Sequence, residues 1–135
     1  MNPQETRCWR WNHEPPHNQC VGEAREIVRK TLADWGLIGL TDDVALIVSE
    51  LVTNAVTHAR SRIKLTLAVN DAYLSGEITD HGPGWIPAAI PQPADADSEG
   101  GRGLGIVAAL AHSWGAAPNF DGQGMRVWFA IRKPA

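Results

Sequence analysis

Apolar residues recur at helical spacing in two stretches of the first half of the chain. In residues 42–60, which read DDVALIVSELVTNAVTHAR, the spacing predicts a helix with one buried stripe. Thr41 is a good N-cap for this helix, and Asp42 and Asp43 place negative charge in its first turn. The stripe comprises Val44, Val48, Leu51, Val52, Ala55 and Val56. An earlier helix over residues 21–35 is predicted from Val21, Ala24, Ile27, Val28, Leu32 and Trp35.

The rest of the pattern predicts strands, one more helix and a long loop. Residues 62–69 and 72–79 have the character of strands, and the short Asn70-Asp71 joint favours an antiparallel hairpin. The segment at about 85–101 is rich in Pro, Ala and acidic residues and fits no regular element, so we interpret it as a lid. The remaining expected elements are a helix over 104–115, a short strand over 116–120 and a last strand over 125–132.

This order of elements indicates an α+β fold. We expect a two-layer sandwich in which the helices cover one face of a mainly antiparallel sheet. A length of 135 residues suits one compact domain, which we place at residues 20–135 after an N-terminal arm at residues 1–19. Within the arm, Trp9 and Trp11 on alternate positions give a weak strand signal.

The composition fits a folded domain and excludes several functions. With 44% hydrophobic and 20% charged residues, the chain lies in the globular range. Its net charge is −3 and its Arg and Lys residues are scattered along the sequence, so it lacks the basic footprint of a nucleic-acid-binding protein. No apolar run is long enough to span a membrane, and the polar N-terminal arm lacks the apolar middle of a signal peptide. We therefore expect a soluble, cytoplasmic protein.

The N-terminal arm and the start of the domain contain Cys8, His13, His17 and Cys20, which are residue types that bind zinc. Their spacing matches no common zinc motif, and a domain of this size needs no metal to fold. We therefore assign these four residues no function.

Three separated groups of residues carry candidate chemistry. In the first, Glu50, Asn54 and His58 follow each other at intervals of four and share one face of the predicted helix. Asn is unfavourable inside a helix, but its amide oxygen suits Mg²⁺, and a Glu one turn earlier could act as a base. A solvated polar face would explain the same pattern, so this group is not specific by itself.

The second and third groups are rich in glycine. The run DHGPG at residues 80–84 follows a strand, where a carboxylate can accept a hydrogen bond from an exocyclic amine; a simple turn explains it equally well. The run GGRGLG at residues 100–105 leads into a helix, whose first amides favour phosphate oxygens. This run lacks the third glycine and the preceding strand of a dinucleotide fingerprint, and the sequence contains no P-loop motif. A flexible linker into the helix would also account for it.

In their order and spacing, the three groups resemble the nucleotide-binding boxes of the GHKL ATPase superfamily. The segments that carry the resemblance are SELVTNAVTHAR (49–60), DHGPGW (80–85), GGRGLGIVAALAHSWG (100–115) and GMRVWFAI (124–131). Within the superfamily, the chain resembles the small bacterial branch of RsbW-like anti-sigma factors and serine-protein kinases. The resemblance spans roughly residues 20–132, and it implies a Bergerat fold that binds ATP with Mg²⁺.

The resemblance also implies roles for individual residues. Asn54 would coordinate the Mg²⁺ on the ATP phosphates, and Glu50 would orient or deprotonate the acceptor hydroxyl. Asp80 would bind the adenine amine, with support from Gly82 and Gly84. The backbone amides that would wrap the triphosphate belong to Gly101, Arg102, Gly103, Leu104 and Gly105, and the Arg102 side chain would add a cation.

Two further positions concern the edge of the implied nucleotide pocket. His58 would lie at that edge, although a lone His on a helix is more often structural. The family's last strand often carries a Thr near the base, and we align Arg126 with it. An Arg at this position would either point to solvent or crowd the adenine pocket.

For the function, the resemblance implies a serine kinase that uses Mg-ATP. Its substrate would be a Ser of a STAS-type anti-sigma factor antagonist, its second partner a sigma factor, and a homodimer would be typical. The alternative is a nucleotide-gated binding module without phosphate transfer, and the presence of Glu50 favours the kinase. A third hypothesis is the catalytic half of a sensor histidine kinase, which needs a phosphoacceptor helix pair that residues 1–19 are too short to supply.

Overall fold

The computed structural model describes residues 4–11, 17–59, 62–81, 102–119 and 124–134. Five strands form one sheet in the order β1-β2-β3-β5-β4, and all neighbours run antiparallel. The strands are β1 (Glu5–Trp11), β2 (Ile63–Val69), β3 (Tyr73–Asp80), β4 (Ser113–Pro118) and β5 (Met125–Arg132). The helices are α1 (His17–Asp34), α2 (Thr41–Ala59) and α3 (Arg102–Leu110), with a short 3-10 helix η1 (Ile38–Leu40) before α2.

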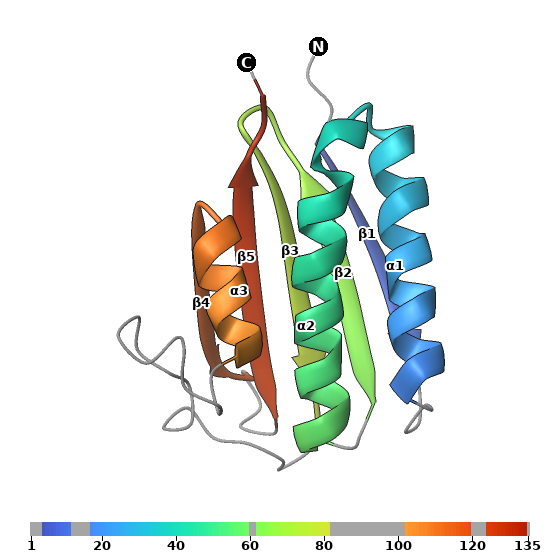
Figure 1. Cartoon of the computed structure of the whole chain (residues 1–135), viewed down its shortest axis with the longest axis vertical. Coiled ribbons are helices and arrows are strands. Elements are labelled where there is room, and N and C mark those ends of the chain that lie inside the picture. Colours follow the sequence, from blue (N-terminus) through green and yellow to red (C-terminus); the bar gives the residue numbers. More distant parts are fainter. Residues whose placement is uncertain (1–3, 12–16, 60–61, 82–101, 120–123, 135) are drawn as a thin grey trace.

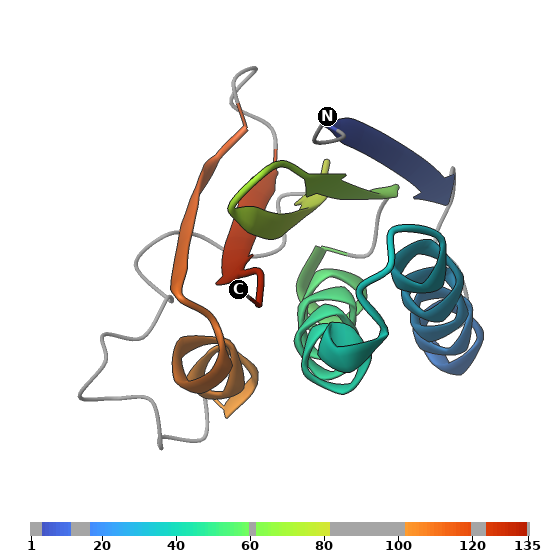
Figure 2. The ribbon, with the colours of Figure 1, turned by 90° about the horizontal axis from the view of Figure 1, so that it is seen from above.

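The three α-helices lie side by side on one face of the sheet, and none of the helices in the described ranges covers the other face, which we call the open face (Figure 2). Alternate residues of β2 and of β5 are buried toward the helices, as expected for strands whose successive side chains point to opposite faces. The predicted α+β sandwich with a mainly antiparallel sheet is confirmed. Among the described residues, no helix is both long and apolar enough to cross a membrane.

Helix α2 supplies the centre of the core. All six residues of its predicted stripe are buried, and Ile47 extends the same surface. The helix packs against α1 on one side and α3 on the other, and its apolar face lies on β2 and β3 (Figure 1). The stripe was predictable because one periodicity of 3.6 residues continues through the whole helix.

The boundary between α3 and β4 differs from the prediction. We expected a helix over residues 104–115, but α3 ends at Leu110 and β4 begins at Ser113. Trp114 and Gly115 pair with residues of β5, and a Cβ on Gly115 would overlap the Trp128 ring. Cross-strand pairing, which the local pattern does not reveal, therefore determines where this helix ends.

Residues 5–11 of the predicted N-terminal arm form the edge strand β1. This strand pairs with β2 along its whole length, from Glu5 opposite Val69 to Trp11 opposite Ile63. Side chains also connect β1 to α1: Trp11 donates its indole N–H to Glu23 at 3.1 Å, and Arg7 pairs with Asp34 at 2.9 Å. Strand β1 is therefore part of the sheet, in line with the weak strand signal from alternating tryptophans.

The two cysteines occupy different environments. Cys8 is exposed on β1, where its Sγ lies 3.6 Å from Thr66 Oγ1, and Cys20 is fully buried in α1. Burial, reinforced by the nearby Glu23, raises the pKa of the Cys20 thiol to about 11. In the part of the chain that the structure describes, no group of three or more His, Cys, Asp or Glu side chains could hold a metal ion.

Gly76 in β3 lies in a tightly packed part of the sheet, so a substitution there tests the packing. A Cβ at this position would overlap the Phe129 ring and lie 3.2 Å from Leu67 Cδ2. We expect Gly76→Ala to lower the free energy of unfolding by about 1–3 kcal/mol, the usual cost of overpacking a core. Gly22 in α1 is the control, because a Cβ there meets no atom within 4 Å and Gly22→Ala should stabilise the helix by about 0.5–1 kcal/mol. Urea denaturation measures both changes, and a Gly76→Ala variant as stable as the native protein would contradict the packing.

The cysteine environments predict how the thiols react. At pH 8 we expect the folded chain to expose one rapidly reacting thiol to a disulfide reagent, and the chain unfolded in denaturant to expose two. Cys20 reacts slowly because it is buried and its raised pKa leaves little thiolate. Cys8→Ser should remove the fast reaction, whereas equally fast reaction of both thiols in the folded protein would exclude the buried position of Cys20.

Candidate functional site

The structure brings parts of the three predicted groups to the same end of the domain. Figure 1 shows that the last turns of α2, the end of β3 and the start of α3 all lie at this end. Helix α2 runs toward it and ends at Ala59, β3 ends there at Asp80, and α3 begins there at Arg102. Segments separated by many residues in the sequence are therefore neighbours in the fold, as a nucleotide site assembled from them requires.

Asp80 is the buried acid of this end. Only 2% of its surface is exposed, which is rare for Asp unless the carboxylate is paired. Its Oδ1 accepts a hydrogen bond from the backbone N–H of Met125 in β5 at 3.3 Å. Its backbone carbonyl accepts a hydrogen bond from the Asn119 side-chain amide at 2.5 Å. Strand β5 and the end of β4 therefore fix the orientation of Asp80.

Gly124 allows the chain to pass close to Asp80. It has a φ of +82°, a conformation that favours glycine, and a Cβ there would overlap the backbone carbonyl of Asp80. Its own carbonyl accepts the N–H of Asn119 at 3.0 Å. Gly124 is thus bonded to Asn119 and precedes Met125, the two residues that hold Asp80. A larger residue at this position would displace the acid.

Glu50 and Asn54 lie on the side of α2 that faces away from α1. Ser49 marks the α1 side, because its hydroxyl accepts a hydrogen bond from Arg25 of α1 at 2.7 Å. At 3.6 residues per turn, Glu50 and Asn54 lie roughly 100° and 140° around the helix from Ser49. Both are half-buried, so they line the boundary between the core and solvent. This position gives a carboxylate and an amide access to a ligand and also holds them in place.

The other predicted site residues are only partly described. His58 lies in the last turn of α2. The first turn of α3 contains Arg102, Gly103 and Leu104, so this helix begins two residues before the predicted start at residue 104. Gly105 follows in α3 and is half-buried. The remaining candidates, Gly82, Gly84 and Gly101, lie outside the described residues, together with the predicted lid at about 85–101. The assignment of all these residues to ATP stays a prediction.

Arg126 and Asp80 lie on opposite faces of the sheet. Its neighbours on β5, Met125 and Val127, are buried toward the helices, so Arg126 projects from the open face. There it lies 3.8 Å from the carboxylate of Glu77 and over the ring of Trp128. Of the two orientations left open for Arg126, the structure shows the one away from Asp80: the β5 residue next to Asp80 is Met125, and Arg126 lies on the opposite face of the sheet.

Sequence reasoning did not identify Asn119, Gly124 and Met125 as parts of the site. The sequence gives two signals near them: DGQG at residues 121–124 is typical of a turn, and Gly124 and Met125 begin the segment 124–131 that carries part of the family resemblance. The contact with Asp80 depends on β3 pairing with β5, which aligns Thr79 with Arg126 across the two strands. Residues far apart in sequence meet only through this register, so the local pattern could not reveal them.

Comparison with known protein families agrees with this arrangement. A family model described as histidine kinase-like ATPase domain matches residues 15–131. Because this match covers most of the chain, the chain belongs to the histidine kinase-like ATPase family, within the GHKL superfamily. The family assignment confirms the resemblance seen in the sequence, and it identifies the chain as an ATP-binding domain.

Two curated relatives are both sensor histidine kinases of Mycobacterium tuberculosis. The chain is 34% identical over 87 residues to the sensor histidine kinase component HK1, a match that covers 58% of the chain and 52% of that protein. The probable sensor histidine kinase HK of another strain matches with the same identity over 87 residues, which cover 23% of its length. The chain thus spans about half of the first relative and about a quarter of the second.

Asp80→Asn tests the adenine assignment without removing the bond to β5. An Asn retains an oxygen that can accept the Met125 N–H, but it loses the negative charge that would accept from the adenine amine. Hydrogen bonds to charged groups contribute about 1.5–3 kcal/mol, so we expect ATP affinity to fall about ten- to hundredfold. Calorimetric titration with Mg-ATP measures the change.

The matched control is Asp71→Asn, the same substitution at an exposed residue of the turn between β2 and β3. That turn lies at the opposite end of β3 from Asp80, so Asp71→Asn should bind ATP as the native chain does. An unchanged ATP affinity in Asp80→Asn would overturn the adenine assignment.

Proposed function

We propose that this domain is an ATP-dependent protein kinase that phosphorylates a serine of a STAS-type anti-sigma factor antagonist. The same molecule would bind and inhibit a sigma factor. The observation that supports catalysis is the pair Glu50 and Asn54, one turn apart and half-buried, on the helix that leads to the Asp80 end of the domain. A module that only binds nucleotide has no need of the Glu50 carboxylate.

The proposed reaction is transfer of the γ-phosphoryl group. The acceptor oxygen forms a bond to phosphorus, the bond to the bridging oxygen of ADP breaks, and the acceptor proton passes to Glu50. Asn54 would hold Mg²⁺ through its amide oxygen, and the first amides of α3 would contact phosphate oxygens. Most of the catalysis in such a transfer comes from positioning and charge stabilisation, which rigid helices supply well.

A second candidate acceptor is histidine. It is favoured by the two relatives, which are named as sensor histidine kinases and are 34% identical to the chain over 87 residues. The same nucleotide site would serve either acceptor, because Glu50, Asn54 and Asp80 act on ATP and on the proton that leaves the acceptor. The alternative without transfer, a nucleotide-gated module that sequesters a sigma factor, needs Asp80 and Asn54 only.

Glu50→Ala separates catalysis from binding. We expect this variant to bind Mg-ATP like the native chain and to transfer phosphate about 10²- to 10⁴-fold more slowly, the range for loss of a general base. The measurement is transfer of label from γ-labelled ATP to a purified STAS-domain protein from the same host. The control is Glu26→Ala, which removes an exposed carboxylate of α1 that pairs with Arg29.

The chemical stability of the label identifies the acceptor. Phosphoserine survives acid, whereas phosphohistidine is hydrolysed, so acid-stable label supports the serine kinase and acid-labile label supports the second candidate. ATP binding without any transfer would favour the nucleotide-gated module. Transfer by Glu50→Ala at the native rate would exclude Glu50 as the catalytic group.

A further inference from the structure

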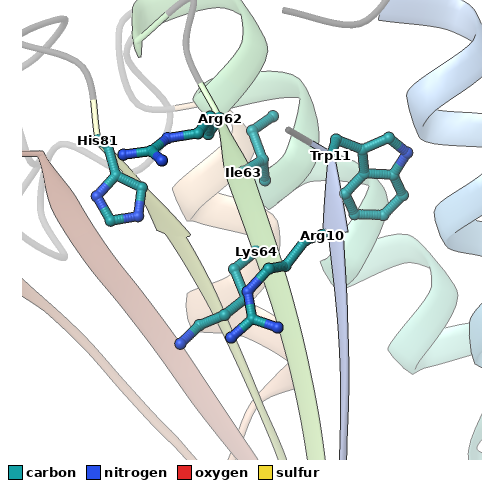
Figure 3. A pocket seen from close by; sticks show the side chains of 6 residues that line it. All are labelled: Arg10, Trp11, Arg62, Ile63, Lys64 and His81. Atoms are coloured by element: carbon teal, nitrogen blue, oxygen red, sulfur yellow. The ribbon is translucent and has the colours of Figure 1, made fainter. Parts of the chain in front are cut away.

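A small cavity at the end of strands β1, β2 and β3 is lined mainly by basic side chains, which lie on the open face of the sheet. Its volume is about 240 Å³, and its lining comprises Arg10, Trp11, Arg62, Ile63, Lys64 and His81. It lies where β1, β2 and β3 meet at the Asp80 end of the domain, and Figure 3 shows the four basic residues around it. Among the residues that the structure describes, no Asp or Glu lines this cavity.

The positive charge here is unusual for this chain. The net charge of the protein is −3, yet Arg10, Arg62 and Lys64 line one cavity. Arg10 of β1 lies directly opposite Lys64 of β2, and like charges in directly opposed positions destabilise a sheet. A bound anion would offset this repulsion.

The order of the strands explains how the group forms. Ile63 pairs with Asp80, so Arg62 and His81 are the next residues outward on the two chains. Arg10 and Lys64 form the next pair inward on the open face, and Figure 3 shows their side chains below those of Arg62 and His81. On the same face, the Thr79 hydroxyl donates a hydrogen bond to the Glu77 carboxylate at 3.1 Å, and an Arg126 guanidinium nitrogen lies 3.8 Å from the same carboxylate.

We propose that this cavity binds a compact, multiply charged oxyanion, namely a phosphate group. Guanidinium forks match phosphate oxygens in pairs, and the Lys64 ammonium adds a point charge. The volume lies below the roughly 300–1,000 Å³ of typical small-molecule pockets, so it suits a phosphate group better than a whole nucleotide. A concave site with several cationic side chains around it also fits a compact anion better than an extended acidic peptide.

This site is separate from the proposed nucleotide site. Asp80 faces the helices, whereas His81, the next residue, faces the open side of the sheet. A phosphate bound in the cavity would therefore lie behind the sheet from ATP, adjacent in the chain to the residue that would bind adenine. The proposal does not depend on phosphate transfer and stands if the domain only binds nucleotide.

Titration of the isotope-labelled full chain with inorganic phosphate tests the proposal. In the absence of nucleotide, we expect the amide signals of Trp11, Ile63 and Lys64 to shift together and to saturate. The double variant Arg62→Gln, Lys64→Gln should weaken this binding by at least about tenfold, since it removes two charged contacts. Arg132→Gln is the control, because Arg132 is an exposed cation of the same face that lies over Tyr73, outside the cavity.

Two further controls distinguish phosphate binding in the cavity from a general effect of salt and from binding at the nucleotide site. Sodium chloride at matched ionic strength should not reproduce the shifts, and phosphate should shift the cavity signals to the same extent in the presence of saturating Mg-ATP, which would occupy the nucleotide site. Methyl phosphate is the second probe: tighter binding than inorganic phosphate supports a phosphate carried on a larger molecule, and weaker binding supports the free ion. Shifts that chloride reproduces, or equal phosphate affinity in the double variant and the native chain, would overturn the proposal.

Discussion

The packing of α2 against the sheet is the interaction on which the rest of the structure depends. This helix lies between α1 and α3 and covers β2 and β3, so its apolar stripe forms the middle of the core. The burial of large side chains contributes about 1.5–3 kcal/mol for each one, which makes the orientation of α2 a strongly favoured one. Glu50 and Asn54 are placed by the same packing, because they occupy the flank that this orientation leaves at the boundary with solvent.

Asp80 depends on a second constraint, the pairing of β3 with β5. The pairing brings the Met125 N–H to the Asp80 carboxylate, and Gly124 makes the close approach possible. Asn119, which follows β4, holds the carbonyl of the same residue. Asn119, Gly124 and Met125 are all far from Asp80 in the sequence, and together they position this acid. A substitution at Gly124 should therefore disturb the proposed nucleotide site directly.

The two faces of the sheet carry different candidate sites. The covered face holds the core and Asp80. The open face gathers Arg10, Arg62 and Lys64 around a cavity, although the basic residues are scattered along the sequence. Asp80 and His81 are consecutive residues at the end of β3, and their side chains lie on opposite faces of the sheet. A ligand in the cavity would therefore contact the residue next to the one that would bind the nucleotide.

The sequence by itself determined the elements whose signal is local. The stripe of α2, the hairpin of β2 and β3 and the polar positions Glu50 and Asn54 follow from periodicities of 3.6 and 2 residues, and the three glycine and polar groups identified the family. The end of α3, the position of Arg126 and the partners of Asp80 were decided by the tertiary structure. Each of these depends on which strands pair and in which register, and that choice is made by contacts between residues far apart in the chain.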